Sequence, residues 1–159
     1  MPTKNPLTHL TEDGDARMVD VGPKDVTSRR AVARARVQMS AATFERLASG
    51  ETPKGDVLAA ARIAGIQAAK RTSELTPLCH MVALTRVEIA IRLEGGQAIV
   101  EATAEARDRT GVEMEAMVAA STAALTLYDM LKAVERGARL VDVRLVEKHG
   151  GRSGDLRLP

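Results

Sequence analysis

Several side chains of this chain have the types and spacings that acid–base chemistry needs. Residues 111–117 read GVEMEAM, so Glu113 and Glu115 follow closely after Thr110. The spacing of Thr110 and Glu113 predicts a capping box, in which each side chain accepts a hydrogen bond from the other residue's amide. A cap of this kind explains Glu113, but it leaves Glu115 without a role.

Asp129 and Lys132 lie later in the same predicted helix, at the spacing of an i,i+3 ion pair. On a helical wheel Glu115 and Asp129 point about 40° apart, and Lys132 lies about 60° from Asp129. Along the helix axis, however, Glu115 and Asp129 are roughly 21 Å apart. One helix cannot bring both to a small reactive centre, so a long ligand or two chains must connect them. The alternative for Asp129 and Lys132 is an exposed ion pair with no role in binding.

The segment LTPLCHM (75–81) places a histidine beside the only cysteine of the chain. A histidine in a loop suits a general acid or base, because its ordinary pKa lies close to neutrality. A satisfied structural histidine is the alternative for His80, and Cys79 is equally explained as a small buried hydrophobic residue. One cysteine and no histidine pair at ligand spacing give no reason to expect a metal site.

Basic residues beside glycines point to a phosphate ligand. Lys54 lies in a Pro-Lys-Gly-Asp turn, and Lys148 and Arg152 flank Gly150-Gly151. Glycines let backbone amides approach an anion, and the basic side chains neutralise its charge. Lys70 ends a predicted helix, where the helix dipole alone also favours a cation. Since the sequence has no Walker loop or GxGxxG pattern, these residues predict a site for a phosphate-containing ligand but do not identify the class of ligand.

Composition narrows the class of protein. The 159 residues suit a single domain over 1–159, with 45% hydrophobic residues to build a core. A net charge of +2 and an aromatic content of 1% argue against nucleic acid as a partner. We expect no membrane segment and no signal peptide, and therefore a cytoplasmic protein. We also expect a mobile N-terminal arm over about 1–17 and a flexible glycine-rich tail over about 148–159.

Hydrophobic periodicity predicts an α+β fold. Alternating apolar residues predict strands, alanine-rich stretches predict helices, and Gly95-Gly96 predicts a tight hairpin. The order is that of a ferredoxin-like β-α-β-β-α-β sandwich with an added helix, its antiparallel sheet packed on helices. The predicted strands are 32–39, 86–94, 98–107 and 140–146, and the predicted helices are 41–48, 57–71 and 111–136.

Six segments resemble one known family in order and over nearly the whole chain. They are ARMVDV (16–21), KGDVLAAARIAGIQAAKRT (54–72), LTPLCH (75–80), TGVEMEAM (110–117), ALTLYDMLKAV (124–134) and GGRSGD (150–155). The family is cyclic pyranopterin monophosphate synthase, also called molybdenum cofactor biosynthesis protein C. The resemblance implies conversion of 3′,8-cyclo-7,8-dihydroguanosine 5′-triphosphate, a cyclised GTP derivative, into cyclic pyranopterin monophosphate with release of pyrophosphate. It also implies a homohexamer, a trimer of dimers with active sites at subunit interfaces.

The resemblance also implies roles for particular residues. The implied catalytic residues are Asp129, Lys132 and Lys54, and the implied substrate-binding residues are Leu78, Cys79, His80, Glu113, Met114, Glu115, Lys70 and Lys148. No metal site or resident cofactor is implied, although Mg²⁺ bound with the substrate phosphates stays open. Two positions depart from the family pattern, since Met81 stands where proline is frequent and Arg152 where lysine is frequent.

Two further readings compete with this enzyme. A non-catalytic, oligomeric nucleotide sensor of the same fold would explain the basic residues but would leave Asp129 without a role. An RNA-binding α+β domain would show steeply salt-dependent affinity, and the low aromatic content and small net charge count against it.

Overall fold

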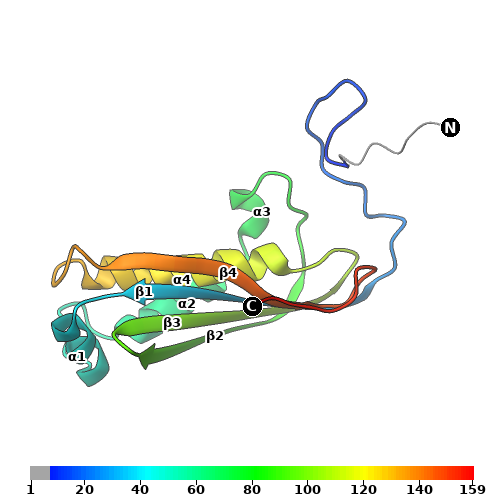
Figure 1. Ribbon diagram of the computed structural model, residues 1–159. Coiled ribbons are helices and arrows are strands. Elements are labelled where there is room, and N and C mark those ends of the chain that lie inside the picture. Colours follow the sequence, from blue (N-terminus) through cyan, green and yellow to red (C-terminus); the bar gives the residue numbers. More distant parts are fainter. Residues whose placement is uncertain (1–7) are drawn as a thin grey trace.

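The computed structural model of the chain describes residues 8–159 and contains five strands and four helices (Figure 1). The elements follow the predicted order, with two short additions, α3 and β5. In chain order they are β1 Thr27–Gln38, α1 Ala41–Ser49, α2 Val57–Ala69, α3 Thr72–Leu75, β2 Leu84–Glu94, β3 Gln97–Asp108, α4 Glu113–Leu131, β4 Arg139–His149 and β5 Leu156–Arg157.

The strands form one antiparallel sheet in the order β2-β3-β1-β4-β5. Helix α4 packs on β1, β3 and β4, and α2 packs on α4 and β2, so both long helices cover the same face (Figure 1). The predicted α+β, ferredoxin-like arrangement with an added helix is confirmed, and α1 is the added element.

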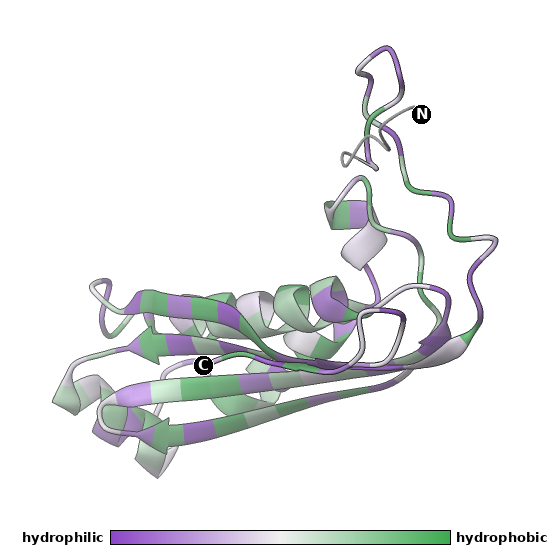
Figure 2. Ribbon diagram, turned by 45° about the vertical axis from the view of Figure 1, so that its right-hand side comes forward, coloured by the Kyte–Doolittle hydropathy of each residue, from purple (hydrophilic) through white to green (hydrophobic). Residues whose placement is uncertain are grey.

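The predicted alternation of more and less buried residues holds over most of β1, β2 and β3, but not in β4, where residues 142–149 are all partly buried. In β1 the side chains of Ala33, Ala35 and Val37 are fully buried toward the helices. The opposite face of the sheet carries charged pairs, such as Arg34 Nη2 at 2.7 Å from Glu101 Oε2. Polar and apolar residues therefore follow one another along the strands, as the purple and green bands in Figure 2 show. Gly95 and Gly96 connect β2 to β3 with positive φ angles of 58° and 76°, as a two-residue hairpin requires.

Helix α4 is shorter than predicted at both ends, spanning Glu113–Leu131 in place of 111–136. Beyond the end of the helix, the Glu135 carboxylate accepts hydrogen bonds from Ser40 N at 3.0 Å and Ser40 Oγ at 2.8 Å. These bonds attach the turn after α4 to the start of α1. A hydrogen bond from Thr43 and then those from Ser40 lower the pKa of Glu135, since each donor favours the ionised carboxylate.

The predicted strand 140–146 extends to His149 because β1 continues to pair with it, with Ala31 opposite Lys148. The tail then returns to the sheet, where Leu156 pairs with Lys148. At the other end of the described chain, Leu10 and Ala16 form a bridge that closes a small turn. The mobility of both ends stays a prediction, and residues 1–7 of the expected arm lie outside the described residues.

Small residues set the distance between α2 and α4. A Cβ added at Gly65 of α2 would lie 3.0 Å from the Ala119 carbonyl oxygen and 3.2 Å from the Ala123 Cβ of α4. The same atom would lie 3.0 Å from Ile89 Cδ1 of β2. Because the core consists largely of alanine and valine, few long side chains are available to move aside.

We therefore expect Gly65→Ala to destabilise the protein, even though alanine is the better helix former by about 1 kcal/mol. Overpacking costs about 1–3 kcal/mol, which corresponds to a fall of a few degrees in the melting temperature. Gly137→Ala is the matched control, because its added Cβ would have only Glu135 Oε1 nearby, at 4.0 Å. Equal melting temperatures for the two variants would contradict the proposed close packing of α2 on α4.

Candidate active site

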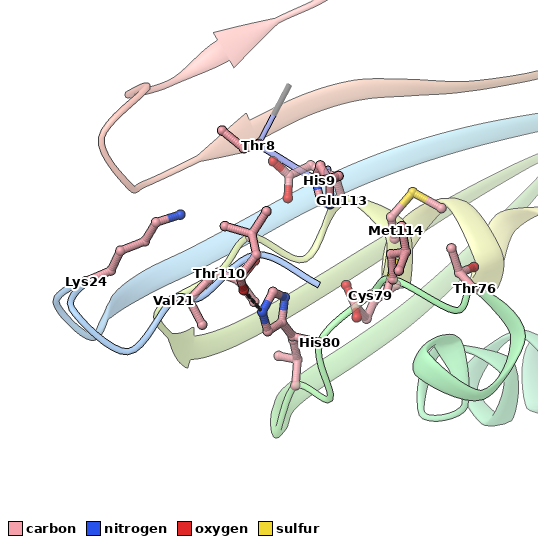
Figure 3. A pocket seen from close by; sticks show the side chains of 15 residues that line it. Thr8, His9, Val21, Lys24, Thr76, Cys79, His80, Thr110, Glu113 and Met114 are labelled. Carbon is pink, nitrogen blue, oxygen red and sulfur yellow. Dashed lines mark hydrogen bonds between the residues drawn. The ribbon is translucent and has the colours of Figure 1, made fainter. Parts of the chain in front are cut away.

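A cavity of about 480 Å³ opens where the start of α4 meets the loop after α3 and the N-terminal segment. Figure 3 shows Thr8, His9, Val21 and Lys24 contributed by the N-terminal segment. The opposite walls come from other parts of the chain and hold six of the residues implied by the resemblance. They are Leu78, Cys79, His80, Glu113, Met114 and Glu115.

His80 is held in place by the N-terminal segment. Its Nε2 lies 2.6 Å from the Val19 carbonyl oxygen, and because a carbonyl only accepts, Nε2 carries the hydrogen and donates it. In the neutral ring Nδ1 is then an acceptor. The loop thus presents a histidine of defined tautomer at the cavity, which suits acceptance of a proton from a ligand.

Glu115 is the least accessible acid of the site, with 4% of its surface exposed. Burial raises its pKa above the ordinary carboxyl value, and the charges of Glu113 and Asp108 raise it further. The carboxyl in turn acts on Cys79, whose pKa is raised by burial and by the charge of Glu115. A carboxyl with a raised pKa that lines the same cavity as a histidine fits a proton donor.

The predicted capping box at the start of α4 is wrong. Val112 occupies the N-cap position, and no side chain caps the helix there. The Glu113 carboxylate lies against Gly111, where an added Cβ would overlap it, and Glu113 Oε1 is 3.0 Å from Lys148 Nζ. An ion pair with β4 has therefore replaced the cap, which leaves Thr110 free to line the cavity.

A second hollow of about 410 Å³ adjoins the first, and Lys24, Thr110 and Gly111 line both. Among residues 8–159, five cationic side chains and a single acid, Asp25, line this hollow, which we call the basic hollow. Its cationic residues are Lys24, Arg29, Arg109, Lys148 and Arg152.

Arg29 is the buried member of the basic hollow, with 9% of its surface exposed. Its guanidinium donates to the carbonyl oxygens of Asp108 and Arg109, each at 3.2 Å. Within residues 8–159 no carboxylate lies within ion-pair distance of this group. Because a buried cation is costly without a counter-charge, the basic hollow is suited to an anionic ligand.

The three implied catalytic residues gather at the opposite end of α4. The carboxylate of Asp129 lies between two lysines, 2.7 Å from Lys132 Nζ and 3.2 Å from Lys54 Nζ. The hydrogen bonds from Lys132 and then Lys54 lower the pKa of Asp129, and Asp129 raises that of Lys132. Within one chain Asp129 is thus an ionised group that orients two lysines.

The chain is similar to known proteins over almost its entire length. The MoaC family model matches residues 18–151. The chain belongs to this family. Relatives named cyclic pyranopterin monophosphate synthase include one from Roseiflexus sp. (strain RS-1), 58% identical over 94% of this chain and 96% of its own. Another, from Parvibaculum lavamentivorans, is 53% identical over 95% of this chain and 96% of its own.

The residues implied by the MoaC resemblance thus occupy four places in one chain. Six line the cavity, Lys148 lies in the basic hollow, and the Asp129 cluster lies roughly 21 Å along α4 from Glu115. Lys70 ends α2 and lines a smaller hollow of about 270 Å³, which shares Val82 with the cavity.

Some residues of the site were not predicted from the sequence, notably Lys24, Arg29 and Arg109. Arg29 could have been found by extending the alternation of Ala33 and Ala31 one step back, which puts an arginine on the core-facing side of the strand. No local sequence pattern marks Lys24 or Arg109 as a site residue. The two lie far apart in the sequence, and only folding brings the Arg109 side chain to the Lys24 carbonyl oxygen, at 3.1 Å.

No group of three His, Cys, Asp or Glu side chains among residues 8–159 is arranged to hold a metal ion. In the same part of the chain no helix is long and apolar enough to cross a bilayer.

Glu115→Gln should separate the chemical role of this residue from any role in stability. A raised carboxyl pKa means that the folded state binds more protons than the unfolded state, so the free energy of unfolding falls as the pH rises through the raised value. Glutamine removes this pH dependence, and we expect an equal or higher melting temperature at neutral pH. Turnover should fall by about tenfold or more, because an amide cannot transfer a proton.

The control for Glu115→Gln is Glu45→Gln, which changes an exposed acid of α1. If Glu115→Gln turned over as fast as Glu45→Gln, Glu115 would have no part in the reaction. Turnover is measured as pyrophosphate release, and stability by thermal melting at several pH values.

Proposed function

We propose that this protein converts 3′,8-cyclo-7,8-dihydroguanosine 5′-triphosphate into cyclic pyranopterin monophosphate and pyrophosphate. The observation that carries the proposal is the joining of an acid–base cavity to a basic hollow, in a chain 58% identical to a relative named cyclic pyranopterin monophosphate synthase. The reaction needs both kinds of environment. Proton transfers accompany opening of the purine ring and closure of the pterin, and a ribose-derived oxygen attacks the α-phosphorus as pyrophosphate leaves.

In this proposal the cavity takes the base and ribose portion of the substrate. His80 offers an acceptor nitrogen and Glu115 a carboxyl that holds a proton more readily than usual. A proton acceptor and a proton donor that line one cavity are suited to removing and returning protons.

The basic hollow takes phosphate oxygens. Arg29 has a fixed guanidinium, and Lys24, Lys148 and Arg152 add charge around the same space. Cations held in place stabilise the charge that develops on a leaving pyrophosphate without reorganising during the reaction.

We further propose that the Asp129 cluster completes this site in a second copy of the chain. The distance of roughly 21 Å along α4 keeps Asp129 and Lys132 away from the cavity of their own chain. A twofold interface would bring the far end of one α4 toward the cavity of its partner. Lys54 and Lys132 would then reach the substrate beside His80. The homohexamer and the cytoplasmic location stay predictions.

The direct experiment is incubation of the purified protein with the cyclised GTP derivative. We expect stoichiometric formation of pyrophosphate and cyclic pyranopterin monophosphate, measured by chromatography and mass spectrometry. A protein that binds the compound without converting it would instead be the nucleotide sensor that remains the alternative. Repeating the assay with EDTA tests whether Mg²⁺ accompanies the phosphates.

A further inference from the structure

A histidine clasp closes the glycine-rich loop beside the basic hollow. His149, at the end of β4, lies between two carboxylates: Nδ1 is 3.1 Å from Asp155 Oδ2, and Nε2 is 3.1 Å from Glu147 Oε2. Asp155 also accepts a hydrogen bond from the Gly150 amide, at 3.1 Å. The loop 150–155 is thus joined at both of its ends through one carboxylate.

The closed loop covers Arg29. Gly150 and Gly151 have positive φ angles of 91° and 80°. An added Cβ would overlap the Ser28 carbonyl oxygen at Gly150 and the Arg29 guanidinium at Gly151. This close approach helps to bury Arg29, and the same loop carries Arg152 and Ser153 into the lining of the basic hollow.

Lys148 completes the arrangement. Its ammonium donates to Ser153 Oγ at 2.8 Å and lies 3.0 Å from Glu113 Oε1, so it joins the loop to the start of α4. If the clasp opened, Arg152 and Ser153 would lose their fixed positions, while Lys148 would stay in β4.

We propose that protonated His149 is a positioning residue that holds the loop 150–155 closed and thereby strengthens phosphate binding in the basic hollow. The inference rests on the proposed function, which assigns that hollow to phosphate oxygens. It adds a dependence of phosphate binding on pH, because an imidazole ordinarily gains and loses its proton near neutrality.

The charges around His149 give the direction of this dependence. The hydrogen bond to Asp155 and then that to Glu147 raise the pKa of His149, and His149 lowers the pKa of Asp155. Two cations also act on Glu147, namely Arg30 of β1, 3.4 Å from Glu147, and Arg157 of β5. The clasp is complete below the ordinary imidazole pKa and is lost as the pH rises through the raised value.

The test uses inorganic pyrophosphate, whose binding to the whole protein is measured by calorimetry from about pH 6 to pH 9. Because pyrophosphate itself loses protons over this range, the measured quantity is the ratio of dissociation constants for His149→Gln and the wild type. At low pH we expect His149→Gln to bind about two- to fivefold more weakly, in keeping with the modest strength of exposed ion pairs. The ratio should approach one as His149 titrates. The pH at which His149 titrates is measured by NMR. Because the chain has three histidines, few imidazole signals need to be assigned.

Asp155→Ala distinguishes the clasp from a simple effect of charge. The variant removes a negative charge near the basic hollow, so electrostatics alone would tighten pyrophosphate binding. An opened loop instead predicts binding about two- to fivefold weaker at low pH. Asp142→Ala is the matched control, because Asp142 is an acid outside the loop, in β4, that pairs with arginines, Arg36 and Arg144. It should bind pyrophosphate as the wild type does.

A ratio of one at every pH, or tighter binding by Asp155→Ala, would overturn the clasp. Failure of the wild type to bind pyrophosphate at any pH would also overturn it, because the hollow would then not take phosphate. The proposed function is judged separately by turnover of the cyclised GTP derivative, so the two can fail independently.

Discussion

Lys132→Ala and Lys54→Ala should each reduce pyrophosphate release by about 100-fold or more while leaving the fold intact. Both ammonium groups contact Asp129, and both side chains are substantially exposed, 50% for Lys132 and 38% for Lys54. Exposed pairs add little to stability, so the melting temperature should change little. The expected loss reflects the need for fixed positive charge on a triphosphate as its pyrophosphate departs.

Arg46→Ala is the control for these lysine variants, because Arg46 is an exposed cation of α1 that lies outside the proposed site. It should keep full turnover at the same substrate concentration. Turnover of Lys132→Ala or Lys54→Ala within a few-fold of this control would rule out the proposed role of that lysine.

The elements whose pattern repeats locally could be predicted from the sequence. Strand β1 alternates alanine and valine with arginine, and only one register buries the small side chains against α4. Asp56 caps α2, accepting from Ala59 N at 2.9 Å, and Gly50 ends α1 in the left-handed region with φ 75°. Each of these signals depends on residues within one turn or one hairpin.

The elements predicted wrongly depend on contacts that the local sequence does not contain. The capping box at Thr110 was a sound local prediction, but Lys148 of β4 attracts the Glu113 side chain away from the cap position. Likewise, the Glu135 carboxylate beyond the end of α4 is bound by Ser40, which lies far away in the chain. In both cases the partner of the carboxylate cannot be identified from the local sequence.

The candidate site, too, has a part that could be predicted from the sequence and a part that depends on contacts between distant segments. The loop of His80 and the acids of GVEMEAM were identified through the resemblance to a known family, and the structure brings them together in one cavity. The basic hollow could not be assembled beforehand, because Lys24, Arg29 and Arg109 meet only when β1, β3 and the N-terminal segment lie together. Spacing on α4 did predict the separation of Glu115 from Asp129.

Recovery of activity from two inactive proteins is the second large effect that we expect. Asp129→Ala damages the far end of α4, and His80→Ala damages the cavity, so each variant alone should have almost no turnover. If every site takes Asp129 from one copy and His80 from another, a hybrid dimer has one doubly damaged site and one intact site.

Mixing the two variants in equal amounts, after reversible dissociation, therefore tests most directly whether two chains build each site. With random pairing about half of the dimers are hybrids, so we predict recovery of roughly a quarter of wild-type activity. Each variant dissociated and reassembled alone is the control, and native mass spectrometry confirms that subunits exchange. Activity that stays at the control level despite confirmed exchange would contradict a shared site and would place Asp129 and His80 on one long ligand within a single chain.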